Sequence, residues 1–256
     1  MRIYSWNMLF RNRELDRAFE FISRADFDIF CLQEVPEKFL KRLKTLPFNI
    51  ADTIDVERLF SQLNRNHLVI LTPHAIEKRG TLMHPDYWQS LQLRARLFVR
   101  CMRLFHWSKI QNRSTLFADV NVVDTLVRVF NLHIAIMRPD WRLREFERAM
   151  AERDQSRPTI VCGDFNVLES APISVLNWFV GGRISDAMRF RHERRRLETR
   201  FLEYELTNPL RGKITHPFSR SQLDHILVSN TFSIKNATVL TNRYGSDHHP
   251  IFAEIE

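Results

Sequence analysis

The sequence predicts an α/β fold in which short strands alternate with amphipathic helices along the chain. Two further observations support this prediction. No internal repeat, low-complexity tract or Pro/Gly/Ser-rich linker divides the 256 residues. The sequence therefore predicts a single domain that spans residues 1–256. Several predicted strands also end at a polar residue followed by a turn, and such strand ends are where α/β folds place their functional sites.

The predicted strands are runs of apolar residues that either alternate with polar residues or continue unbroken, as in a buried strand. In chain order they are Met1–Trp6, Asp28–Gln33, His67–Leu71, Leu116–Val123, Leu126–His133, Thr159–Cys162, Leu223–Ser229 and Ile251–Ile255. Asp124 and Thr125 lie between two of these runs and predict a hairpin.

The predicted helices have apolar residues at helical spacing and recognisable ends. In chain order they are Arg13–Ser23, Pro36–Leu46, Asp140–Arg153 and Ser170–Val180. The second begins with a proline in its first turn, and the last has Ser170 as its N-cap and Gly181 beyond its end.

The composition is that of an ordinary globular protein with an excess of positive charge. Hydrophobic residues make up 44% and charged residues 27% of the chain, which excludes an intrinsically disordered protein. Only 6 residues are glycine, which argues against a glycine-rich nucleotide-binding loop. The formal charge of +8 favours a polyanionic partner, but weakly, because net charge also serves solubility.

The cysteines and the hydropathy pattern predict a soluble cytoplasmic protein. Cys31, Cys101 and Cys162 lack a CxxC spacing, so they predict reduced thiols, with Cys31 and Cys162 as small core residues on strands. No apolar run approaches the ~18 residues of a membrane span, and the first residues do not resemble a secretory signal. We expect a monomer with no obligate protein partner.

Residues that could bind a divalent cation or a phosphate stand at the ends of separate predicted strands. Mg²⁺ prefers carboxylate and amide oxygens, and a histidine beside a buried aspartate is held in one tautomer and can take up a proton. The residues are Asn7, Glu34, His133, Asp164, Asn166, Asp224, Asp247 and His248. Each alone fits a turn, a helix cap or a core histidine, but their joint placement predicts a site.

The segments around these residues carry a family resemblance. They are SWN (Ser5–Asn7), LQEV (Leu32–Val35), NLH (Asn131–His133), GDFN (Gly163–Asn166), LDHILVS (Leu223–Ser229) and SDHHP (Ser246–Pro250). In this order they resemble the endonuclease/exonuclease/phosphatase superfamily, which includes DNase I, exonuclease III type nucleases, inositol phosphatases and sphingomyelinases. The resemblance implies a four-layered α/β sandwich of two mixed β-sheets packed face to face with helices outside, and an active site at one edge.

The resemblance also implies a metal cofactor, Mg²⁺, with Mn²⁺ as a substitute. Glu34 resembles the main metal-ligand glutamate of the family, and Asn7 and Asp247 would lie beside the metal or its waters. Phosphodiester hydrolysis needs an activated water, neutralisation of charge on the phosphate and help for the leaving group, which such a site can supply.

The remaining strand-end residues resemble the catalytic residues of the family. Asp164 and Asn166 would orient the attacking water and the scissile phosphate. His248, oriented by Asp224, would contact the phosphate or act as general base, and His133 would lie near the leaving group. The choice between His248 and Asp164 as proton acceptor stays open, because their titrations would be coupled.

Three further residues resemble substrate contacts less closely. Arg113 precedes a predicted strand where nucleases of the family have an arginine facing the substrate, although a lone arginine also fits a solvated surface charge. Thr215 and Arg220 would reach the phosphate or brace the loop before Asp224. The residues after LQE are Val and Pro instead of the Thr and Lys of AP endonucleases, and no convincing site tyrosine is present, which argues against a dedicated abasic-site enzyme.

The stretch Tyr87–Ala118 is basic and rich in aromatic residues. Its cations are Arg94, Arg96, Arg100, Arg103, Lys109 and Arg113, and its aromatic residues include Trp88, Phe98, Phe105 and Trp107. Such a composition suits nucleic acid or an anionic lipid surface. An alternating strand with Leu91, Leu93, Ala95, Leu97 and Val99 facing the core explains the pattern equally well.

Three hypotheses about function follow. The first is a Mg²⁺-dependent phosphodiesterase that acts on DNA or RNA. The second keeps this chemistry but takes a phospholipid or phosphoinositide headgroup as substrate. The third is a noncatalytic binding module, which the complete set of site residues argues against.

Overall fold

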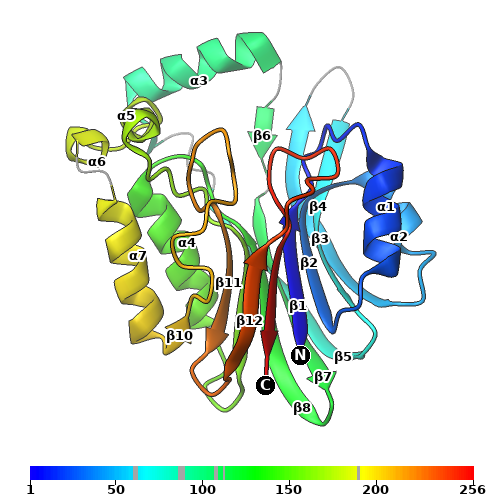
Figure 1. Ribbon diagram of the computed structural model, residues 1–256. Coiled ribbons are helices and arrows are strands. Elements are labelled where there is room, and N and C mark those ends of the chain that lie inside the picture. Colours follow the sequence, from blue (N-terminus) through cyan, green and yellow to red (C-terminus); the bar gives the residue numbers. More distant parts are fainter. Residues whose placement is uncertain (60–62, 86–89, 107–108, 112, 189–190) are drawn as a thin grey trace.

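Two β-sheets pack face to face, and helices cover their outer sides (Figure 1). The computed structural model describes residues 1–59, 63–85, 90–106, 109–111, 113–188 and 191–256. The first sheet has the strand order β12-β13-β1-β2-β4-β3-β6, and the second has the order β10-β11-β9-β8-β7-β5. Both sheets mix parallel and antiparallel pairs, so the four-layered α/β sandwich implied by the resemblance is confirmed.

The strands of the first sheet are β1 (Arg2–Asn7), β2 (Ile29–Pro36), β3 (Asn49–Leu59), β4 (Leu63–Thr72), β6 (Lys109–Gln111), β12 (Ile234–Val239) and β13 (Ile251–Ile255). Those of the second sheet are β5 (Ala75–Met83), β7 (Ser114–Val122), β8 (Thr125–His133), β9 (Thr159–Asp164), β10 (Leu206–Thr207) and β11 (Asp224–Ser229). The helices are α1 (Leu15–Arg24), α2 (Glu37–Leu43), α3 (Leu93–His106), α4 (Pro139–Ala151), α5 (Ala171–Phe179), α6 (Ile184–Met188) and α7 (His192–Glu203).

The core lies mainly between the two sheets and is built from small and branched aliphatic side chains. Cys31 on β2 and Cys162 on β9 meet there, as the sequence predicts for two buried thiols. Aromatic residues fill the outer layers instead. Phe39 joins α2 to the first sheet, and Phe146 and Phe201 join α4 and α7 to the second. Non-directional burial of apolar surface therefore holds all four layers together.

The strand register brings the polar strand ends to one edge of the sandwich. β1 runs parallel to β2, and β8 runs parallel to β9 with His133 opposite Asp164. β11 runs antiparallel to β9, which places Asp224 at its first residue opposite Asp164 as well. Because the carboxyl ends of parallel strands meet at the same edge, side chains from distant parts of the sequence converge there.

The predicted elements are all present, with ends that differ by a few residues. Some elements are absent from the sequence prediction, namely β3, β5, β6, β10, β12, α3, α6 and α7. The strand interpretation of Leu91–Val99 is wrong, because residues from Leu93 onward form helix α3. Leu93 and Leu97 are exposed in this helix, whereas Leu91 and Ala95 are buried, and the side chain of Val99 lies outside what the structure describes. An alternation of leucine and arginine is ambiguous, since both residues also favour helix.

The structure describes only some of the aromatic side chains in the basic stretch Tyr87–Ala118. Trp88 and Trp107 lie outside the residues that the structure describes, as does the side chain of Phe105. Phe98 packs against Phe179 of α5, with ring centroids 5.4 Å apart. In the described part of the chain, no helix is long and apolar enough to cross a membrane.

Candidate active site

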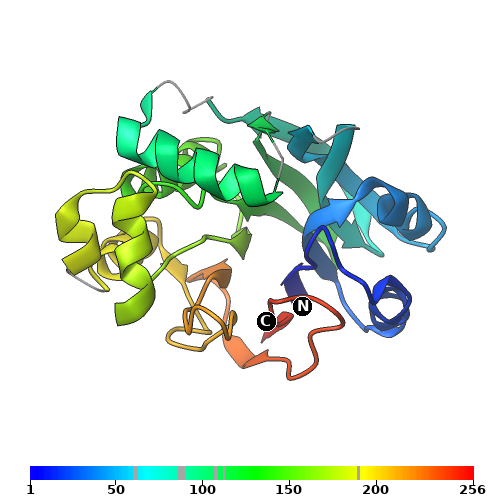
Figure 2. The same ribbon diagram turned by 90° about the horizontal axis from the view of Figure 1, so that it is seen from above.

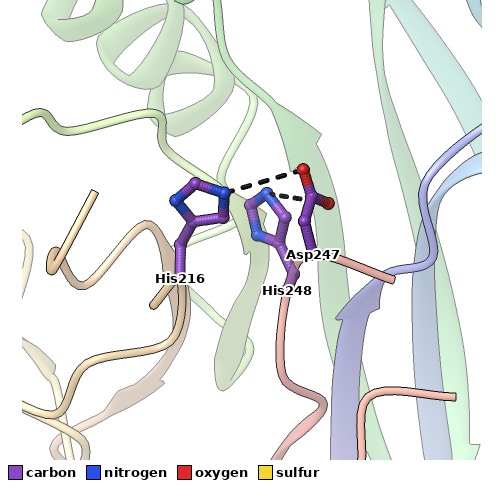
Figure 3. Close-up of side chains that lie close together, drawn as sticks. All are labelled: His216, Asp247 and His248. Carbon is purple, nitrogen blue, oxygen red and sulfur yellow. Dashed lines mark ion pairs between the residues drawn. The ribbon is translucent and has the colours of Figure 1, made fainter. Parts of the chain in front are cut away.

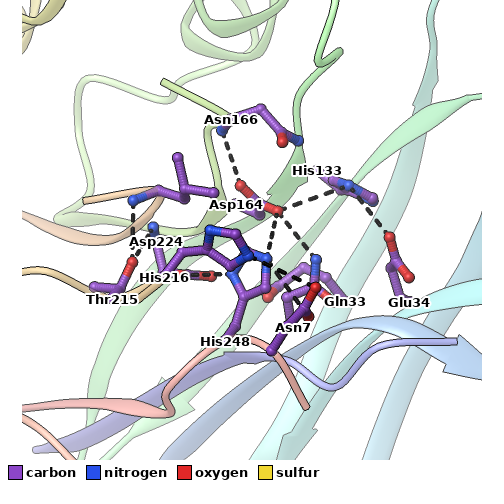
Figure 4. A network of polar contacts seen from close by, with 12 residues as sticks. Asn7, Gln33, Glu34, His133, Asp164, Asn166, Thr215, His216, Asp224 and His248 are labelled. Carbon is purple, nitrogen blue, oxygen red and sulfur yellow. Dashed lines mark hydrogen bonds and ion pairs between the residues drawn. The ribbon is translucent and has the colours of Figure 1, made fainter. Parts of the chain in front are cut away.

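Asp164 stands at the centre of a polar network at the end of β9 (Figure 4). Its Oδ1 accepts a hydrogen bond from the backbone N–H of Asn166 at 2.8 Å. Its Oδ2 accepts one from the side-chain amide of Asn7 at 3.0 Å. Asn166 has a left-handed backbone (φ +52°) and donates its own amide to the carbonyl of Ile134 at 2.9 Å. The network thus fixes both oxygens of a buried carboxylate.

Glu34 reaches the same edge from a bulge in β2. The register of β2 against β4 shifts after Leu32, and Glu34 adopts a left-handed backbone (φ +56°). Such a conformation costs a non-glycine residue about 1–2 kcal/mol, so the fold maintains it against local strain. Oε2 of Glu34 accepts the N–H of Phe10 at 3.0 Å, and Oε1 lies 3.8 Å from Nε2 of His133.

Two histidines face Asp164 from opposite sides with matching geometry. Nδ1 of His248 lies 2.8 Å from Asp224 Oδ2, and Nδ1 of His133 lies 2.7 Å from Asp55 Oδ2. Because an ionised carboxylate only accepts hydrogen bonds, each Nδ1 carries a proton. The two Nε2 atoms lie 3.8 Å and 3.9 Å from the same atom, Asp164 Oδ2.

These carboxylates favour the charged form of both imidazoles. Burial alone lowers the pKa of His133, but the negative charge and hydrogen bond of Asp55, with help from Asp164, outweigh burial and raise it to about 9. Burial likewise opposes protonation of His248, and the charge of Asp224 with that of Asp164 raises its pKa to about 10. Two positively charged rings therefore flank one carboxylate in the metal-free protein.

The sequence alone does not identify Asp55, although the structure places it in the site. It is fully buried on β3, next to an irregularity in the pairing of β3 with β4. Its strand was not predicted, because Asn49–Leu59 carries acidic residues on both faces and offers no clear alternation. The only sequence signal that could identify Asp55 is that a strand over these residues would point this aspartate toward the core, where an acidic residue is unusual.

Asp247 occupies the exposed rim of the site together with a histidine that has no predicted role (Figure 3). Its carboxylate lies 3.6 Å from Nε2 of His216 and 4.0 Å from Nε2 of His248. Burial alone raises its pKa, but the hydrogen bond from His216 and the charge of His248 outweigh burial and lower it. Nδ1 of His216 accepts the backbone N–H of Ser219, so its Nε2 carries the proton and faces Asp247.

Thr215 lies beneath the site and braces the start of β11. Its hydroxyl accepts the backbone N–H groups of Leu223 and Asp224, both at 3.0 Å, and the side chain is fully buried. Of the two roles that the sequence leaves open, the geometry fits the brace. Arg220 is exposed on the same loop, with a left-handed backbone (φ +50°), and its contact with phosphate stays a prediction.

Arg113 has a different environment from the one that the sequence predicts. It pairs with the fully buried carboxylate of Glu145 at 2.9 Å and also donates to the backbone carbonyl of His133. The guanidinium is therefore engaged inside the protein, where it holds the strand end that carries His133. A contact of Arg113 with substrate stays a prediction.

Another histidine, His225, lies behind the site and is fully buried. Its ring packs on Phe165 with centroids 4.5 Å apart, and Nδ1 lies 3.0 Å from the carbonyl of Leu223. Burial lowers its pKa well below the ordinary value, and the neighbouring charge of Arg194 adds to this effect. His225 is therefore uncharged and packs in the core, in contrast to the charged His133 and His248.

The donor set at this edge fits a hard divalent cation. Figure 4 shows the carboxylates of Glu34 and Asp164 and the amide of Asn7 at this edge, and these are the kinds of ligand that Mg²⁺ prefers. The side chains of Asp164 and Asp224 group with His248, and that of Asp247 groups with His248 and His216. Among the described residues, Asp224 Oδ1 and Gln33 Oε1 are also buried with no hydrogen-bond partner. Several acidic groups and buried oxygens without a hydrogen-bond partner lie in this site. A bound divalent cation would supply the positive charge that the two histidines do not provide.

Comparison with known proteins places this arrangement in context. The model of the endonuclease/exonuclease/phosphatase family matches residues 4–248. A search of the curated proteins gave no match. Among solved structures, an endonuclease/exonuclease/phosphatase from Beutenbergia cavernae is 14% identical, with a TM-score of 0.69 over 100% of this chain and 71% of its own.

Two further solved structures bear names that describe an activity. A 3′ phosphatase from Neisseria bound to a product DNA hairpin is 18% identical, with a TM-score of 0.62 over 100% of this chain and 99% of its own. A mannosyl-6-phosphatase from Bacteroides thetaiotaomicron is 18% identical, with a TM-score of 0.63 and the same coverage of 100% and 99%. At this identity these similarities establish the fold alone. The family match over nearly the whole sequence shows more: this chain belongs to the endonuclease/exonuclease/phosphatase family.

Proposed function

We propose that the protein is a divalent-metal-dependent phosphodiesterase that hydrolyses nucleic acid at this site. The observation that carries the proposal is the pair of carboxylate-held histidines, His133 and His248, whose Nε2 atoms converge on Asp164. This arrangement offers one fixed proton acceptor between two donors, which is what hydrolysis of a phosphate ester requires.

The residues divide the chemistry as follows. Asp164, held by Asn7 and the N–H of Asn166, orients the attacking water and accepts its proton. His248 and His133 donate to the nonbridging and leaving oxygens, because Asp224 and Asp55 fix their rings with Nε2 toward the substrate. Each fixed donor lowers the barrier by placing charge where the transition state develops it.

Glu34, Asn7 and Asp247 would hold the metal, with Mg²⁺ as the first choice and Mn²⁺ as a substitute. The metal would neutralise phosphate charge and lower the pKa of a bound water. Asp164 and Asn166 would lie next to the reacting phosphate and orient it.

The charge distribution supports nucleic acid as the substrate, with Arg113 and Arg220 retained as predicted substrate contacts and Thr215 as the brace of the loop before Asp224. The formal charge of +8 surrounds a site that is itself acidic, so cationic side chains lie outside the site and can meet a phosphate backbone. The 3′ phosphatase from Neisseria, which has a similar fold, is bound to a product DNA hairpin, and this supports a nucleic acid as the substrate proposed here. A cytoplasmic location and a monomeric state remain parts of the proposal.

A second candidate is hydrolysis of a phospholipid or phosphoinositide headgroup. One observation favours it: exposed aliphatic side chains on α3 that offer nothing to a base or a sugar. The site chemistry is the same in both cases.

The test is a substrate panel with matched variants. Purified protein with Mg²⁺ or Mn²⁺ is incubated with single- and double-stranded DNA, RNA, sphingomyelin and inositol phosphates. We expect cleavage of a nucleic acid that Glu34→Ala or Asp164→Ala reduces by about 10³-fold or more, while Glu77→Ala, an exposed carboxylate on β5, leaves it unchanged. Full activity of Asp164→Ala contradicts the mechanism, and activity on lipid alone replaces the first candidate with the second.

A further inference from the structure

Helix α3 presents an apolar and cationic face to solvent. Among the side chains of α3 that the structure describes, those of Leu93, Leu97, Arg100 and Cys101 are exposed and recur at the spacing of one helical face. Leu93 is 72% exposed and Leu97 is 51% exposed, and Ala95 on the opposite face is fully buried. Helix packing against the rest of the protein therefore leaves two leucines uncovered.

Helix α3 is anchored to the segment that precedes α6, which has exposed apolar residues of its own. Arg94 donates to the carbonyl of Gly182 and lies over the ring of Trp178, which ties α3 to the segment between α5 and α6. In α6, Ile184 is 65% exposed and Met188 is 77% exposed. We call the exposed surface of Leu93, Leu97, Arg100 and Cys101 the α3 face.

Helix α3 as a whole is positively charged, and among its described side chains Arg100 is the arginine on the α3 face. The sequence of α3, LRARLFVRCMRLFH, contains four arginines and no acidic residue. A helix that combines exposed leucines with arginines and has no acid is typical of interfacial helices that lie on anionic bilayers.

The kind of apolar side chain distinguishes lipid from nucleic acid. Single-stranded nucleic acid is bound by aromatic rings that stack on bases and by cations that meet phosphates. Leucine side chains have no ring for stacking, so the exposure of Leu93 and Leu97 is unexplained by a nucleic-acid partner. Acyl chains bury them directly, while arginine meets the lipid phosphates.

Helix α3 lies at the same end of the molecule as the candidate active site. Figure 1 shows α3 at the end of the sandwich opposite the N-terminus, the end at which β1 terminates and the candidate active site lies. Figure 2, which views this end from above, shows α3 lying across it, beside the ends of the two sheets. A membrane that contacts α3 would lie next to the site.

From these observations we infer that the α3 face binds the surface of an anionic membrane. The inference goes beyond the proposed chemistry and does not depend on which phosphodiester is cleaved.

Cys101 provides a direct reporter for the test. Among the three cysteines it is the exposed one, and Cys31 and Cys162 are buried. The full chain is labelled at Cys101 with an environment-sensitive fluorophore and titrated, in EDTA, with vesicles of phosphatidylcholine plus phosphatidylserine. Vesicles of phosphatidylcholine alone and a short DNA duplex are the comparisons. EDTA prevents turnover, so failure of this experiment and failure of the proposed activity are separate results.

Two matched double variants decide the role of the leucines. We expect Leu93→Ser/Leu97→Ser to weaken binding to the anionic vesicles by about tenfold or more, because two large apolar side chains no longer enter the bilayer. Leu202→Ser/Val123→Ser removes two similarly exposed side chains, from α7 and from the turn between β7 and β8, and is expected to leave binding unchanged. Circular dichroism checks that each variant is folded.

The expected result is a blue shift of the Cys101 label with anionic vesicles that is weaker with phosphatidylcholine alone. Three results would overturn the inference: no binding of the wild-type protein to anionic vesicles, equal binding by the Leu93→Ser/Leu97→Ser variant, or a label that responds to DNA and not to vesicles. The last would identify the α3 face as a nucleic-acid surface.

Discussion

At the scale of single residues, two buried carboxylates hold the site histidines through Nδ1, the ring nitrogen that faces away from Asp164. Asp224 and Asp55 each fix the Nδ1 proton of one histidine, and only Asp224 follows from a sequence motif. Motif reasoning finds residues in short recognisable segments, such as GDFN and SDHHP. It does not find Asp55, because its role arises from a contact with His133, 78 residues away in the sequence.

We expect Asp55→Asn to lower kcat by about 100-fold, in the range for loss of a positioned proton donor. The neutral amide no longer stabilises the charged ring, so the pKa of His133 falls and the alkaline limb of the pH–rate profile moves to lower pH. Steady-state kinetics across pH measure both effects. Asp52→Asn, on the same strand beside Lys44, is the control. An unchanged alkaline limb in Asp55→Asn would show that this pair has no catalytic role.

At the scale of elements, strand ends and strand irregularities position the site. The sequence predicts the strands that carry Asn7, Glu34, His133 and Asp164, because buried strands have strong apolar patterns. It does not predict the bulge that turns Glu34 inward, since a register shift depends on the partner strand. Helix α3 is missed because its leucines and arginines alternate as in a half-buried strand, and the exposure of Leu93 and Leu97 removes the spacing of a core-facing helix.

The close approach of β8 and β9 gives a prediction for Gly163. Its φ is +141°, and a Cβ there would lie 1.9 Å from the carbonyl oxygen of Leu132. Gly163→Ala should therefore lower the free energy of unfolding by about 3 kcal/mol and displace Asp164 from His133. Gly212→Ala is the control, because its φ is +77° but no atom lies within 4 Å of the new Cβ, so about 1 kcal/mol is expected. Urea unfolding of both variants measures the difference, and equal losses would refute the steric explanation.

At the scale of the whole molecule, the histidines fall into two classes with opposite effects on stability. Burial lowers the pKa of His225, His67 and His84 from 6.5, so below pH 6.5 the unfolded chain binds more protons at these residues and stability falls. The pKa values of His133 and His248 are raised to about 9 and about 10. Their stabilising contribution is complete below pH 6.5 and is lost as the pH rises toward 10.

The metal-free protein is therefore expected to be most stable close to pH 6.5, the ordinary pKa of histidine. Urea unfolding in EDTA at a series of pH values provides the check. A stability that keeps rising between pH 7 and pH 9 would contradict the raised pKa values of the two site histidines, since no depressed histidine gains stability in that range.

The pairing of β1 with β13 has a consequence for how the protein is made. Arg2 stands opposite Glu254, so neighbouring strands in the first sheet come from nearly opposite ends of the described sequence. During synthesis, β1 leaves the ribosome before β13. Until β13 emerges, the edge of β1 that pairs with β13 has no hydrogen-bonding partner. Asn7 and His248 likewise come together only after nearly all of the chain has emerged. A nascent chain that lacks the residues from Asp247 onward therefore cannot assemble the polar network around Asp164, so this network forms only late in synthesis.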